Sequence, residues 1–109
     1  MLLISVISIV KMIAVISKFE VQNGKEEDVK MAFKNRPGFV EHAEGFVRLD
    51  VLSPLNNPAE IHLITYWENE EDFEYWHRHH LKDSHKNIPK GLKLVPKSWE
   101  LTKYAHISS

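Results

Sequence analysis

Four of the seven histidines lie close together, at positions 77, 79, 80 and 85, and imidazole groups at this density could bind a transition metal. His77 and His80 are one helical turn apart, whereas His77 and His79 point in different directions on a helix and cannot share an ion. No cysteine occurs, and no carboxylate in the same run offers an obvious further ligand. We therefore favour solvated histidines near a helix C-terminus, where positive charge is stabilising, over a zinc site.

Signatures of nucleophilic or nucleotide-dependent catalysis do not occur in the chain. The sequence contains no G-x-S-x-G, P-loop, G-x-G-x-x-G or H-E-x-x-H pattern. Ser17 has no acid or histidine beside it in the sequence that would suggest a triad. Asp50 and Glu60 could pair across a hairpin, but a solvated face explains them better than an acid–base dyad. Nucleophilic hydrolysis thus has little support.

The aromatic residues Phe73 and Trp76 are three positions apart on a predicted helix. Aromatic side chains at this spacing more often belong to a core than to a cofactor site. An earlier predicted helix repeats the spacing, with Phe33 followed three residues later by Arg36. Two helices that each carry an aromatic residue toward one side could wall a pocket.

Ser17 is a small polar residue in the middle of an apolar strand face, between Val15 and Phe19. A buried hydroxyl is costly unless it has a hydrogen-bond partner, which is either the backbone or a ligand. We therefore predict an apolar slot with three aromatic walls (Phe33, Phe73 and Trp76), Ser17 on its floor and His85 at its rim. Such a slot suits a small planar hydrophobic ligand, although spacing alone does not identify it.

The elements that must position these residues follow from hydrophobic periodicity and turn signals. Alternating segments at 12–21, 46–52, 60–67 and 98–106 predict strands. Acid-rich starts and apolar stripes predict helices at 25–36 and from Asn69 onward, with a further turn or two within 81–87. The order β-α-β-β-α-β is the ferredoxin-like unit of the α+β class, with an antiparallel sheet covered on one face by two helices.

The second face of that sheet must also be covered. The residues predicted to lie on it are too apolar for water, namely Ala14, Ile16, Val47, Leu49 and Val51. Packing of two sheets face to face would bury them. We therefore expect a homodimer.

Composition limits the remaining possibilities. The 109 residues allow one domain, which we place at 12–109, preceded by an accessory apolar segment at 1–11. That segment lacks a positively charged start and a cleavage site, and Lys11 and Lys18 make it too short and too charged to span a bilayer. The net charge of −1 provides no basic excess for nucleic acid. The absence of cysteine fits a cytoplasmic location. We expect neither a nucleic-acid nor a membrane partner.

From 12 to about 104 the sequence resembles the antibiotic-biosynthesis-monooxygenase (ABM) superfamily, and within it the haem-degrading monooxygenases. The resemblance is carried by short matching segments, which are Phe33-x-x-Arg36, Gly45-Phe46, Tyr66-Trp67-Glu68, Asp72-Phe73-x-x-Trp76 and Ser84-His85-Lys86. It implies that the ferredoxin-like units form a dimeric α+β barrel. It also implies that His85 is the axial ligand of the haem iron and that Trp76 distorts the porphyrin.

In those enzymes an asparagine on the first strand bonds the distal oxygen species, and this chain has Ser17 at that position. A serine hydroxyl can donate a hydrogen bond, but it reaches less far than an asparagine amide, or acts through a water. Binding of haem without degradation, or the processing of another aromatic ring, are therefore further possibilities.

The resemblance implies a small monooxygenase that degrades haem, which would be both substrate and cofactor. The catalytic residues would be Trp76 and Ser17, and the haem-binding residues His85, Phe33, Arg36 and Phe73. Electrons would come from an external donor, since nothing in the sequence suggests a flavin or nicotinamide site. One alternative is a cofactor-independent monooxygenase of a quinol or polycyclic aromatic substrate, with His85 or a neighbouring histidine as base. Another is a non-enzymatic ligand-binding or stress-related dimer.

Overall fold

The computed structural model describes residues 12–36, 40–84 and 89–109, with the side chains of 81–84 excluded. Its elements run β1 (Ile13–Glu20), α2 (Glu26–Lys34), a short 3₁₀ helix η1 (Val40–His42), β2 (Phe46–Leu52), β3 (Glu60–Trp67), α3 (Glu70–Ser84) and β4 (Glu100–Ala105). This order confirms the predicted β-α-β-β-α-β unit. The segment 1–11 lies outside the described residues.

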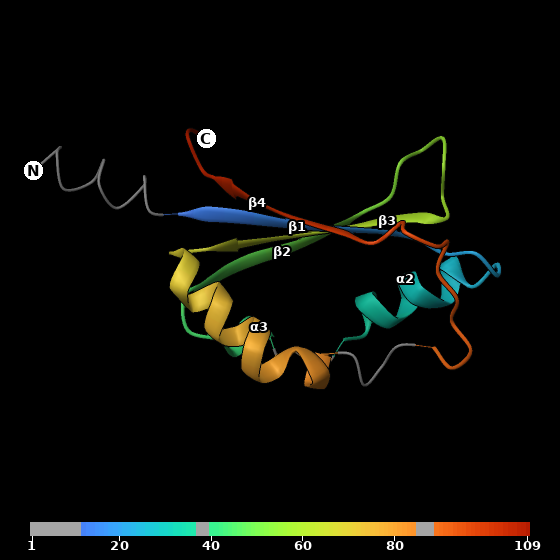
Figure 1. Cartoon of the computed structure of the whole chain (residues 1–109), viewed down its shortest axis with the longest axis horizontal. Helices are drawn as coiled ribbons and strands as arrows, with labels where there is room; N and C mark the ends of the chain where they lie inside the picture. The colour runs from blue at the N-terminus through green and yellow to red at the C-terminus, as the bar shows by residue number, and fades with distance from the viewer. Residues whose placement is uncertain (1–11, 37–39, 85–88) are drawn as a thin grey trace, which may run out of the picture.

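Within these ranges the strands form a four-stranded antiparallel sheet in the order β2-β3-β1-β4. Both helices lie on the same side of this sheet (Figure 1). The central strand β1 pairs with β3 and β4, so that Ser17 faces Leu63 on one side and Leu101 on the other. The ferredoxin-like α+β fold predicted from the sequence is therefore confirmed.

The core beneath the helices consists of two apolar clusters. The first contains the buried residues Val15, Val40, Trp67 and Phe73. The second contains Phe19, Val21, Val29 and Ile61. Both clusters draw on the odd-numbered residues of β1, because alternate side chains of a strand point to the same face. Ser17 therefore lies on β1 between the residues that contribute to the two clusters.

The helix α3, which the sequence predicted from Asn69 onward, is fixed at its start by a side-chain cap. The side-chain Oδ1 of Asn69 accepts a hydrogen bond from the backbone N–H of Asp72 at 2.8 Å, and Asn69 Nδ2 donates to Asp72 Oδ2 at 3.0 Å. Such caps satisfy backbone donors that a helix leaves unpaired in its first turn. This cap sets where α3, with Phe73 and Trp76, begins.

The faces of β2 differ from the prediction. Leu49 and Val51 were expected on the open face of the sheet, but they pack against the two clusters on the helix side. The cause is a register shift between Phe46 and Arg48, which inserts one residue and reverses the alternation after it. Phe46, Leu49 and Val51 thus share one face, and Val47 stays exposed.

In the described ranges, no helix is long and apolar enough to cross a membrane.

Candidate functional site

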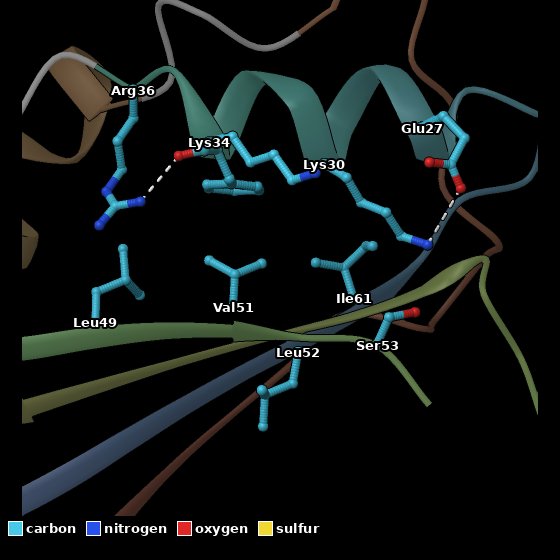
Figure 2. A pocket seen from close by; sticks show the side chains of 10 residues that line it. Glu27, Lys30, Lys34, Arg36, Leu49, Val51, Leu52, Ser53 and Ile61 are labelled. Atoms are coloured by element: carbon cyan, nitrogen blue, oxygen red, sulfur yellow. Dashed lines mark hydrogen bonds and ion pairs between the residues drawn. The ribbon is translucent and has the colours of Figure 1, made fainter. Parts of the chain in front are cut away.

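A cavity of about 300 Å³ lies between α2 and the sheet. Figure 2 shows Leu49, Val51 and Ile61 pointing from the strands toward α2, whereas Leu52 points to the other side of the sheet. The cavity is lined by Glu27, Lys30, Phe33, Lys34, Arg36, Leu49, Val51, Leu52, Ser53 and Ile61. Aliphatic side chains form its floor, and α2 forms its opposite wall.

The charged residues of this cavity come from α2 and from Arg36, which lies two residues after the end of this helix. Three cations, Lys30, Lys34 and Arg36, stand against a single lining carboxylate, Glu27. Figure 2 places Arg36 at one end of the apolar floor and the Glu27–Lys30 pair at the other end. The cavity is therefore apolar below and cationic along its helical wall, although the whole chain has a net charge of −1.

The predicted residues Phe33 and Arg36 both line the cavity. Arg36 Nε donates to Glu41 Oε1 at 2.7 Å, and its Nη1 donates to the backbone oxygen of Phe33 at 2.9 Å. The second bond satisfies a carbonyl near the end of α2, a position where helices lack internal partners. Arg36 thus closes the end of α2, and its charge is already paired with that of Glu41.

Ser17 lies on the helix-covered face of β1, half-buried between Val15 and Phe19. Its hydroxyl makes no hydrogen bond to the part of the chain that the structure describes. A half-buried hydroxyl without a protein partner can donate to a ligand or a water. The structure thus places Ser17 at the boundary of the two clusters, and Ser17 is not among the residues that line the cavity.

Phe73 and Trp76 belong to the first cluster. Phe73 is 4% exposed, and its ring centroid lies 5.7 Å from that of Trp67. Trp76 is half-buried, with its ring centroid 5.9 Å from Trp67, and its Nε1 is buried without a hydrogen-bond partner. A buried indole N–H normally has an acceptor, because leaving it unpaired costs free energy. Trp76 therefore offers a donor that no described residue uses, whereas Phe73 is a core residue.

His77 and His79 point in different directions from α3, as their spacing in the sequence predicted. His77 packs on Phe73 at a centroid distance of 5.4 Å, and His79 packs on Tyr75 at 4.3 Å, so the two rings serve different faces of α3. Among the described residues, no group of three or more histidines, aspartates or glutamates could hold a metal ion. The predicted ligand His85 lies outside the described residues.

An ion-pair cluster ties α3 to the edge strand β4. Lys103 Nζ lies 2.6 Å from both Glu70 Oε2 and Glu74 Oε1. The hydrogen bond from Lys103 is the main cause that lowers the pKa of Glu74, and the bond to Glu70 is the first cause that raises the pKa of Lys103. This contact holds the first turns of α3, just before Trp76, against the sheet.

The structure adds several cavity residues that sequence reasoning missed. Leu49 and Val51 were missed because the bulge in β2 cannot be seen in a strict alternation. Lys30 and Lys34 were missed although a signal existed. Together with Phe33 they follow the i, i+3, i+4 spacing of a single helix face. An aromatic residue flanked by two lysines on one face indicates an apolar wall with a charged margin.

Residues 12–87 match the family model of antibiotic biosynthesis monooxygenases. A haem oxygenase (mycobilin-producing) of Mycobacterium tuberculosis, strain CDC 1551 / Oshkosh, is 30% identical over 61 residues. That match covers 56% of this chain and 58% of the relative, so it spans little more than half the length of either protein.

Two solved structures have similar folds. One is the haem degrader MhuD of Mycobacterium tuberculosis with two haems bound in its active site, at a TM-score of 0.73 and 21% identity, covering 89% of this chain and 97% of that one. The other is SnoaB, a cofactor-independent oxygenase of Streptomyces nogalater, at a TM-score of 0.71 and 15% identity, covering 91% of this chain and 96% of that one. At these identities the likeness concerns the fold.

Proposed function

This chain belongs to the antibiotic biosynthesis monooxygenase family, and on that premise we propose that it is a haem-degrading monooxygenase. The observation that carries the proposal is the 30% identity to a haem oxygenase. The aromatic side chains that the sequence predicted for a planar ligand support it in part, because the described ones all lie on the helix side of the sheet, with Phe33 in the second cluster and Phe73 and Trp76 in the first.

The residues present can be tested against the chemistry of haem. Its flat, apolar ring suits the aliphatic floor of the cavity and the side chain of Phe33 above it, whereas Trp76 lies outside the cavity lining, in the first cluster. The cavity of about 300 Å³ lies at the lower end of the size range of ligand pockets, so a tetrapyrrole would fill it and extend beyond it. The unpartnered N–H of Trp76 and the hydroxyl of Ser17 are both polar groups that a ligand could satisfy.

In this proposal haem is the substrate and supplies the iron at which O₂ reacts. His85 would bind that iron, because neutral imidazole is a common axial ligand. Trp76 would press on one side of the ring, and Ser17 would donate a hydrogen bond from the strand side. Phe33, Arg36 and Phe73 would border the ring or support its walls. The reducing electrons would come from an external donor, and the working unit would be a homodimer.

Titration of the purified protein with hemin tests the proposal. We expect a Soret band in the wild-type protein, ring opening when a reductant and O₂ are added, and loss or gross change of that band in His85→Ala. The matched control changes two histidines on α3, His79→Ala and His80→Ala together, and should leave the band nearly intact. A wild-type protein that binds no hemin would exclude haem degradation.

A second candidate is a cofactor-independent monooxygenase acting on a quinol or polycyclic aromatic ring. It is favoured by Ser17, whose hydroxyl reaches less far than the asparagine amide expected in a haem degrader. In that case the electron-rich substrate would itself reduce O₂, and a histidine would remove its proton. Consumption of O₂ with a quinol by metal-free protein, together with an absence of hemin binding, would favour this candidate.

A further inference from the structure

The wall of the cavity carries more positive charge than its surroundings neutralise. Lys30 Nζ lies 3.4 Å from Glu27 Oε1, but the side chain of Glu27 is 79% exposed whereas that of Lys30 is 23% exposed. An ion pair with one solvated partner contributes little. Lys34, one turn further along α2, makes no hydrogen bond or ion pair with the part of the chain that the structure describes. These two ammonium groups are thus poorly compensated.

Arg36 differs from the two lysines. Its pair with Glu41 at 2.7 Å involves side chains that are 33% and 32% exposed, so both charges are partly shielded from water. It also donates to the carbonyl of Phe33, which fixes the guanidinium at the end of α2. Arg36 therefore has a structural partner already, and the charge available to a ligand comes from Lys30 and Lys34.

We propose that Lys30 and Lys34 form a carboxylate-binding margin of this cavity, so that its ligand is an apolar molecule carrying at least one acidic group. The inference deepens the proposed function, on which it rests in taking the cavity as part of the ligand site. The apolar body of the ligand would lie between Phe33 and the floor of Leu49, Val51 and Ile61. Its carboxylate would extend toward the two ammonium groups.

The chemistry of the margin favours an acid over a neutral ligand. Lysine ammonium groups are point charges on flexible stems, so they can follow a carboxylate without demanding one geometry. Charge-assisted hydrogen bonds of this kind are stronger than neutral ones, and a low-dielectric floor beside them strengthens the attraction. A porphyrin with free propionates and a smaller aromatic acid share this chemistry, and the experiment must separate them.

The test measures binding of matched acid and neutral ligands without iron, so that neither axial ligation nor turnover contributes. One pair is protoporphyrin IX and its dimethyl ester, and the other is 9-anthracenecarboxylate and 9-anthracenemethanol. Fluorescence titration gives the affinity ratio of acid to neutral compound. We expect the wild-type protein to prefer the acid of at least one pair roughly tenfold, and that preference to weaken as salt is raised.

Variants of the full chain identify the residues responsible. Lys30→Gln and Lys34→Gln should each reduce the acid preference about threefold, and the double change should remove it together with its salt dependence. Substitution of both by arginine should retain it. Glu27→Gln should strengthen acid binding, because it removes the one lining carboxylate. Lys93→Gln, an exposed change outside the cavity lining, should alter nothing.

The outcomes separate this inference from the proposed function. If the protein degrades hemin but the Lys30→Gln, Lys34→Gln double variant keeps the acid preference of the wild type, the inference is overturned and the proposed function stands. Preference for 9-anthracenecarboxylate in a protein that binds neither protoporphyrin IX nor hemin would support the inference and exclude the haem proposal. If the wild-type protein binds none of the four compounds, or binds acid and neutral compounds equally, the inference is wrong.

Discussion

Gly45 lies in contact with the cap of α3 and has little room for a side chain. Its φ is +78°, a value that residues with a Cβ rarely adopt, and a Cβ there would overlap the side chain of Asp72. The Asp72 side chain cannot withdraw without losing the hydrogen bond that its Oδ2 accepts from Asn69 Nδ2. Gly45 is therefore required both by backbone conformation and by space.

We predict that Gly45→Ala lowers the free energy of unfolding by about 2–4 kcal/mol, from left-handed strain and a disturbed cap. Gly24→Ala is the matched control. Gly24 has a similar φ of +73°, but its Cβ would meet nothing within 4 Å. That change should cost only about 1 kcal/mol, the strain contribution alone. Equal losses in urea unfolding would show that contact with Asp72 does not matter.

Residues of the candidate site were predictable to different extents. Phe33 and Arg36 could be found from their helical spacing, and the structure places both on the cavity wall. The floor could not be found, because Leu49 and Val51 come from β2, where a bulge determines which side chains point toward α2, and they meet Ile61 of β3 only in the folded sheet. A bulge arises from how two strands pair, and a single strand's alternation does not record it.

At the level of elements, the cluster of Lys103 with Glu70 and Glu74 predicts a pH-dependent contribution to stability. The pKa of Glu74 is lowered below its ordinary 4.5, so its contribution is present above that value and is lost as the pH falls through the lowered pKa. The pKa of Lys103 is raised above 10.5, so its contribution is present below that value and is lost as the pH rises through the raised pKa.

Lys103→Met should therefore lower the melting temperature most between these limits, near about pH 7, and progressively less as the pH falls below 4.5. The groups are exposed, so the effect should be small and should shrink in concentrated salt. Lys93→Met is the control, because the Lys93 side chain has no ion pair among the described residues. Differential scanning calorimetry across pH measures both. A difference that persists unchanged at low pH would contradict the assignment to ion pairs.

The bounds of the helices and strands were easier to predict than the side of the sheet to which their side chains point. The strands β2 and β3 begin and end where alternation predicted, and β1, α2 and β4 differ from the predicted bounds by one or two residues. These bounds follow from local signals such as the acids at the start of α2 and the Asn69 cap. Which side chains of β2 point toward the helices depends on how this strand pairs with β3, and that pairing is a tertiary property.

At the level of the whole molecule, we predict that residues 1–11 are dispensable. The central strand β1 begins at Ile13 and pairs with both β3 and β4, and the backbone oxygen of Met12 accepts a hydrogen bond from the backbone N–H of His106 at 3.0 Å. A chain that starts at Met12 should fold and retain its ligand binding and association state. Circular dichroism and hemin titration measure this. Insolubility, or a large loss of stability, would instead make the segment an integral part of the fold.

The open face of the sheet is the basis of the last prediction, a homodimer formed through that face. The helices cover only one side of the sheet, and the other carries Ala14, Ile16 and Ile64, with Leu52 still 52% exposed (Figure 1). Unlike the prediction from sequence, this face excludes Leu49 and Val51 and includes Arg48 stacked on Tyr66 at 4.5 Å. It is therefore less apolar than expected, yet still apolar at its centre.

Burial of such a face contributes roughly 25 cal/mol per Å², and a standard interface buries about 800 Å² per partner, enough to offset the cost of association. Changing Ile16 and Ile64 together to glutamate should yield a folded monomer, because like charges would then oppose each other across the interface while the clusters under the helices stay intact. Met31→Glu, on the exposed side of α2, should remain dimeric. Sedimentation equilibrium distinguishes these states. A wild-type protein that sediments as a monomer of 12.7 kDa at micromolar concentration would mean that the open face is covered by something other than a second copy.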